Sequence, residues 1–132
     1  MKKKGAMKIL LVDDSNVQLL TTELQLKNEY EIATAKSGKE ALEYLTRGNV
    51  PDLIILDILM PDMDGWETFG RIKAISLLHS VPIFFLSSVN DQAEIDKAYN
   101  LGASGFLTKP YDAEDLLAEI KKVLDEKQSS SA

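Results

Sequence analysis

The chain has 132 residues, of which 45% are hydrophobic and 27% charged, a balance typical of one globular domain with one sizeable core. Its formal charge of −6 argues against direct nucleic-acid binding, which needs a basic face. It has no cysteine for disulfides or thiolate metal sites and no apolar run near the roughly 18 residues of a membrane helix, so we expect a soluble cytoplasmic domain.

The two ends of the chain differ from its middle. Residues 1–7, MKKKGAM, are basic but lack the apolar stretch of a secretory signal, and we interpret them as a short leader or a cloning remnant. Residues 128–132, QSSSA, are polar and are predicted to form a disordered tail. The domain itself is expected to cover residues 8–127.

Five short apolar runs, rich in β-branched or aromatic residues, predict strands at 8–12, 30–35, 53–56, 81–86 and 105–108. The segments between them and after the last have helical spacing. The clearest example is the final one, where apolar residues follow the i, i+3, i+4, i+7 pattern at Leu116, Leu117, Ile120, Val123 and Leu124.

Capping residues delimit the predicted helices. Ser37 with Glu40 forms a capping-box pattern, and Asp112 is placed to begin the last helix. Gly48 and Gly102 are placed where helices end. Strands that alternate with helices of 10–15 residues indicate βαβ units, and hence an α/β fold: a doubly wound, flavodoxin-like parallel sheet in the order 2-1-3-4-5 with five helices.

Reactive side chains follow four of the five predicted strands. Asp13 and Asp14 follow the first strand, and Asp57 follows the third. Ser87 follows the fourth strand and Lys109 the fifth. Ligands of open α/β sheets bind beyond the carboxyl ends of the strands, near the point where the strand order switches. We therefore expect three carboxylates, a hydroxyl and an ammonium to meet in one shallow pocket.

The chemistry of this group points to phosphoryl transfer. Clustered carboxylates repel one another and provide the hard oxygen ligands that Mg²⁺ prefers, and Mg²⁺ commonly binds phosphate oxygens as well. Lys109 could neutralise a phosphoryl oxygen and Ser87 could donate a hydrogen bond to another. A carboxylate can itself be the nucleophile, and Asp57, on the central strand, is the candidate. Taken alone, the adjacent aspartates would more often be solvated charges at a helix N-terminus; their arrival with the other groups at four strand ends favours the site.

Four motifs in this order, LLVDDS, LIILDILMPDMDG, FFLSS and GASGFLTKP, resemble those of response-regulator receiver domains of two-component signalling, including the single-domain chemotaxis regulators. The resemblance covers residues 8–127. It implies that Asp57 accepts a phosphoryl group from a sensor histidine kinase or a phosphotransfer protein. It also implies that Asp14, Asp57 and the backbone carbonyl of Leu59 bind Mg²⁺ directly, and that Asp13 binds it through water.

The same resemblance implies a conformational switch. Ser87 would move to the phosphoryl oxygen and Phe106 would turn inward, while a cis bond before Pro110 would aim Lys109 into the site. A downstream target protein would read the face formed by the fourth helix, the fifth strand and the last helix. The domain would be a regulatory phosphoacceptor and not an enzyme, supporting only its own phosphotransfer and dephosphorylation.

Two alternatives stay open. The chain could be a receiver module of a larger regulator with a DNA-binding or enzymatic output domain. A Mg²⁺-dependent phosphohydrolase is less favoured, because such enzymes commonly carry an Asp-x-Asp pattern on the first strand, whereas Asp13 and Asp14 are adjacent. We also hypothesise that apolar Leu59 and Val89 slow dephosphorylation, because they offer hydrolytic water no hydrogen-bond partner.

Overall fold

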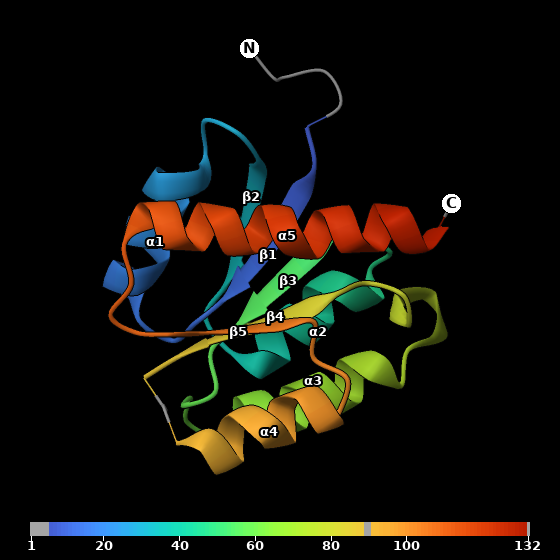
Figure 1. Ribbon diagram of the computed structural model, residues 1–132. Helices are drawn as coiled ribbons and strands as arrows, with labels where there is room; N and C mark the ends of the chain where they lie inside the picture. The colour runs from blue at the N-terminus through green and yellow to red at the C-terminus, as the bar shows by residue number, and fades with distance from the viewer. Residues whose placement is uncertain (1–5, 89–90, 132) are drawn as a thin grey trace.

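The computed structural model describes residues 6–88 and 91–131, and within these ranges strands alternate with helices (Figure 1). The parallel strands lie in the order β2-β1-β3-β4-β5, which confirms the predicted doubly wound α/β fold. The elements are β1 (Lys8–Val12), α1 (Asn16–Leu26), β2 (Glu31–Ala35), α2 (Gly38–Thr46), β3 (Leu53–Leu56), α3 (Gly65–Lys73), the 3₁₀ turn η1 (Ser76–Leu78), β4 (Ile83–Ser87), α4 (Gln92–Asn100), β5 (Gly105–Thr108) and α5 (Ala113–Ser131).

Two strands differ from their predicted bounds by one or two residues. β2 begins at Glu31 because the amide of Tyr30 donates to the carbonyl of Leu26 and so belongs to the turn that closes α1. β4 begins after Pro82, which has no amide hydrogen to give to a ladder, and it extends to Ser87. The extension matters for the site, because Ser87 lies within the sheet and not in the loop that follows.

The predicted helix ends are confirmed. The Ser37 hydroxyl accepts a hydrogen bond from the Glu40 amide at 3.0 Å, and the Asp112 carboxylate accepts one from the third residue of α5 at 2.9 Å. Gly48 and Gly102 follow α2 and α4 with φ of +97° and +105°, a region that favours glycine. These short-range signals delimit the helices that return the chain to the start of each next strand.

The sheet is covered on both faces, so its strands bury side chains in both directions (Figure 1). On one face α1 and α5 pack against Ile9, Leu11 and the residues of β3 and β4 that point the same way. On the other face α2, α3 and α4 pack against Leu10, Val12 and their neighbours. This leaves the carboxyl ends of β1, β3, β4 and β5 as the edge where polar side chains can gather.

At the C-terminus, α5 remains helical to Ser131, into the segment 128–132 for which the sequence predicted disorder. Residues 125–131 include no apolar residue, so the sequence has no hydrophobic pattern that would predict a helix there. Ala132 and residues 1–5 of the predicted leader lie outside the described residues. Of the described helices, none combines the length and the apolar character that crossing a membrane requires.

Candidate phosphoryl and metal site

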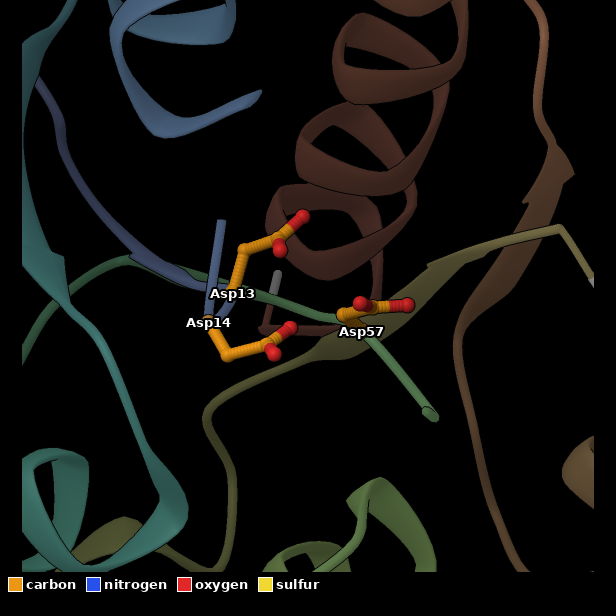
Figure 2. Close-up of side chains that lie close together, drawn as sticks. All are labelled: Asp13, Asp14 and Asp57. Atoms are coloured by element: carbon orange, nitrogen blue, oxygen red, sulfur yellow. The ribbon is translucent and has the colours of Figure 1, made fainter. Parts of the chain in front are cut away.

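Three carboxylates meet where β1 and β3 end (Figure 2). Asp13, Asp14 and Asp57 each offer an oxygen, and these oxygens lie within 4.8 Å of one another. Asp13 and Asp57 are only 6% and 7% exposed, whereas Asp14 is open to solvent. The buried pair is held by the backbone, because the Asp57 amide donates to the carbonyl of Val12 at 2.9 Å. The sheet therefore fixes the acidic group on the strand ends, as the sequence predicted.

Lys109 brings the positive charge from β5. Its ammonium nitrogen lies 3.1 Å from a carboxylate oxygen of Asp13 and 3.8 Å from one of Asp57. Its backbone amide donates to the Ser87 carbonyl at 2.8 Å, which ties the end of β5 to β4. The predicted cis bond between Lys109 and Pro110 is present. The lysine thus bridges the two buried carboxylates.

Burial raises the pKa of Asp57 from its ordinary value of 3.8 to about 6. Lys109 opposes this rise, and the charge of Asp13 adds to it. One ammonium therefore does not compensate fully for burying the Asp57 carboxylate beside other acids. A divalent cation would supply the missing positive charge, so the donor set and its charge fit Mg²⁺.

The loop that follows Asp57 returns tightly to α3. The Gly65 amide donates to the Ile58 carbonyl at 2.7 Å, and Asp64 caps α3 through the Glu67 amide. Leu59 extends from this loop with 58% of its surface exposed. Its role as a carbonyl ligand stays a prediction, and Val89, its expected partner in excluding water, lies outside the described residues.

The two predicted switch residues occupy different environments. Ser87 is fully buried at the end of β4. Phe106 is half-buried on β5, and its ring centroid lies 6.2 Å from that of Phe85. Phe85 in turn contacts Trp66, with the centroids 5.0 Å apart. Aromatic contacts therefore connect the neighbourhood of the acidic loop with β5.

Two contributors to this site were not predicted from the sequence. Gly65 allows the close return of the loop, and its only sequence signal was a glycine directly after the capping Asp64. Tyr111 bonds to α1 across 89 residues of sequence, through its contact with Thr22. No local pattern marks such a long-range contact.

The sheet order and the position of the acidic group define a class: a flavodoxin-like α/β domain with a polar site at the switch point between β1 and β3. Residues 9–121 match the family model described as response regulator receiver domain. The chain belongs to this family, whose members are regulatory signalling domains that interact with histidine kinases and output domains and generally bind Mg²⁺ at an acidic pocket.

Individual relatives agree with this assignment. The transcriptional regulatory protein CrdR of Helicobacter pylori is 38% identical over 117 residues, which are 89% of this chain and 54% of CrdR. The response regulator PleD of Caulobacter vibrioides is 35% identical over 88% of this chain and 26% of PleD. The structure of the Vibrio cholerae chemotaxis protein CheY4 matches with a TM-score of 0.84 and 32% identity, over 90% of this chain and 99% of that one. The chain thus spans about half the length of CrdR and about a quarter of the length of PleD.

Proposed function

We propose that the domain is a cytoplasmic, phosphorylation-activated switch in which Asp57 accepts a phosphoryl group from a phosphohistidine of a sensor kinase or phosphotransfer protein. The observation that carries the proposal is the bridging of Asp13 and Asp57 by the Lys109 ammonium, beside a third carboxylate. In the transfer, an Asp57 oxygen forms a bond to phosphorus as the nitrogen–phosphorus bond of the donor breaks. The products are an acyl phosphate and a free imidazole.

Asp13, Asp14 and Asp57 would hold Mg²⁺, with the Leu59 carbonyl as a further ligand. When bound, the ion supplies positive charge to the carboxylates and to the oxygens of the transferred group. Lys109 neutralises a phosphoryl oxygen from the β5 side, since its ammonium already lies beside Asp57. The Ser87 hydroxyl donates to a further phosphoryl oxygen.

The phosphorylated state is read at a distance from Asp57. Contacts of the acyl phosphate with Ser87 and Lys109 exist only in the active arrangement, so phosphorylation shifts the population toward it. Phe106 then turns inward and changes the face formed by α4, β5 and α5. On this face Tyr99 is 46% exposed and available to a target protein. Direct binding of nucleic acid is not part of the proposal, because the chain has a formal charge of −6.

A second arrangement is favoured by the lengths of the relatives. Because CrdR and PleD extend well beyond the matched region, the domain could regulate a DNA-binding or enzymatic output domain within a larger regulator. The site chemistry is the same in both arrangements. A Mg²⁺-dependent phosphohydrolase remains less favoured, because the adjacent aspartates lack the Asp-x-Asp spacing.

Trp66 fluorescence tests the phosphoacceptor site. Trp66 lies in the first turn of α3, which the Asp57 loop enters, and the Lys97 ammonium lies 4.3 Å from its ring centroid. We expect saturable fluorescence changes when Mg²⁺ and then beryllofluoride, a phosphoryl mimic, are added. The beryllofluoride step should be lost in Asp57→Asn. A wild-type protein that binds neither ligand by calorimetry would refute the proposal.

Leu59→Asn should accelerate loss of the phosphoryl group. An amide at this exposed position could hydrogen-bond the attacking water, and one such bond corresponds to roughly a fivefold increase in the hydrolysis rate. The decay of ³²P-labelled protein measures that rate. Leu77→Asn is the matched control, because Leu77 is 65% exposed but lies in η1, before the opposite end of β4. Equal lifetimes for Leu59→Asn and the wild type would contradict the hypothesis.

A further inference from the structure

The Tyr111 hydroxyl connects the loop after β5 to α1. It lies 2.9 Å from the Thr22 hydroxyl, accepts from the Gln18 side-chain amide at 3.2 Å and donates to the Gln25 side-chain carbonyl at 3.4 Å. Tyr111 follows Lys109 by two residues. The lysine that reaches Asp13 and Asp57 is therefore separated by only one residue from an anchored tyrosine.

The hydrogen atoms of this network can all be assigned. A tyrosine hydroxyl has one hydrogen to donate and can accept two hydrogen bonds. It donates to Gln25, accepts from Gln18, and accepts from Thr22 as its second bond. The Thr22 hydroxyl then accepts from the Gln18 side-chain amide at 3.3 Å. Each of these polar groups has a partner, which favours a single arrangement.

The helix that receives the hydroxyl follows the aspartates directly. α1 begins at Asn16, and the Ser15 amide donates to the Asp13 carboxylate at 3.0 Å. Thr22 is only 2% exposed, so the contact lies inside the fold. Tyr111 therefore joins the segment that follows Lys109 to the segment that follows Asp13. These are the two sides of the ion pair across the site.

Lys109 needs such support because its side chain has many rotamers, and its position decides where positive charge lies. On the β4 side, its amide is bonded to the Ser87 carbonyl. Two residues later, the Tyr111 hydroxyl forms the hydrogen bonds that connect this segment to α1. Lys109 and Tyr111 also line one groove together with Gln18 and Gln25.

We propose that Tyr111 is a positioning residue: through its hydroxyl bonds to α1 it holds the loop after β5 so that the Lys109 ammonium meets the phosphoryl group on Asp57. The inference rests on the proposed function and adds a residue that does not itself touch the reacting atoms. The Tyr111 ring packs against the core beside α1 and α5, so Tyr111→Phe preserves that packing and removes only the hydroxyl.

The test uses the whole 132-residue chain and compares two affinities of each variant by calorimetry: Mg²⁺ alone, and beryllofluoride at saturating Mg²⁺. Tyr111→Phe is expected to weaken beryllofluoride binding roughly fivefold, the equivalent of one hydrogen bond. It should not weaken Mg²⁺ binding, because a displaced ammonium repels the cation less. A general loss of structure would weaken both.

Three further variants separate the hydroxyl contact from other effects. Thr22→Val should weaken beryllofluoride binding in the same direction, whereas Thr22→Ser, which keeps the hydroxyl, should not. Tyr44→Phe is the matched control, because Tyr44 packs on the opposite face of the sheet. Combined with Lys109→Gln, Tyr111→Phe should cause no additional loss.

Unchanged beryllofluoride affinity in Tyr111→Phe would overturn the inference while leaving the proposed function in place. An equal additional loss in the Lys109→Gln background would also overturn it, because Tyr111 would then act independently of the lysine. Failure of the wild type to bind beryllofluoride would instead refute the proposed function, and the inference with it.

Discussion

Asp57→Asn is expected to abolish phosphorylation completely and, without Mg²⁺, to make the folded protein more stable at pH 7. Modification is lost because the amide has no nucleophilic carboxylate oxygen. Stability rises because Asp57 is only 7% exposed and lies close to Asp13, and the variant no longer buries a charge at this position. Phosphate incorporation from acetyl phosphate and urea unfolding in EDTA measure the two effects.

The stability effect has a defined pH dependence. A carboxyl group whose pKa is higher in the folded state takes up protons on folding, so the unfolding free energy falls as pH rises through that interval. For Asp57 the interval runs from 3.8 to about 6. The advantage of Asp57→Asn should therefore be small near the lower limit and reach about 3 kcal/mol above the upper one.

Titrating groups that do not interact with Asp57 are common to both proteins and cancel in this comparison, whereas Asp13, Asp14 and Lys109 interact with its charge. Circular dichroism spectra that superimpose would show that the variant keeps its fold. Phosphate retained on Asp57→Asn would refute the assignment of the acceptor. A stability difference that does not grow between pH 4 and pH 7 would contradict the raised pKa of Asp57.

Gly65→Ala is expected to destabilise the fold by about 2–3 kcal/mol, the usual range for overpacking a rigid site. A Cβ atom at Gly65 would lie 2.6 Å from the Ile58 Cα and would also clash with the Asp57 carbonyl oxygen. Both neighbours are backbone atoms, so neither can rotate away. Relief requires the loop to move away from α3, which displaces the Asp57 carboxylate.

Gly70→Ala provides the matched control. Gly70 lies in the same helix, and a Cβ atom there would meet no atom within 4 Å. Alanine should stabilise this helical position by about 0.5–1 kcal/mol, opposite in sign to Gly65→Ala. Urea unfolding of both variants makes the comparison, with Mg²⁺ affinity as the second readout. Similar stability changes at the two positions would show that close backbone contact is not the reason why position 65 requires glycine.

Local signals in the sequence were sufficient for most of the secondary structure. The caps at Ser37 and Asp112 and the glycines after α2 and α4 depend on residues a few positions away, and the structure has each one. The two shifted strand boundaries have local causes as well, in Pro82 and in the turn at Tyr30. The helix through residues 128–131, where disorder was predicted, has no apolar residue that a sequence pattern could detect.

The residues of the candidate site were predictable, because the strand order places the carboxyl ends of β1, β3, β4 and β5 side by side independently of the loop conformations. Asp13, Asp57, Ser87 and Lys109 all lie at the carboxyl ends of strands, so their grouping follows from the sheet order. The raised pKa of Asp57 was not predictable, because it depends on how deeply the loop and α1 bury that carboxylate. The distances from the Lys109 ammonium to Asp13 and Asp57 were not predictable either, since they depend on side-chain placement.

By itself, the sequence determined the order of elements, the doubly wound α/β class and the set of groups at the carboxyl edge of the sheet. The alternation of strand and helix patterns and the strand-end positions contain that information. Only the tertiary structure decided the contact between Tyr111 and α1 and the close return of the chain at Gly65. Each contact joins two different segments of the chain. Packing of the whole core brings those segments together, so no local sequence pattern predicts the contact.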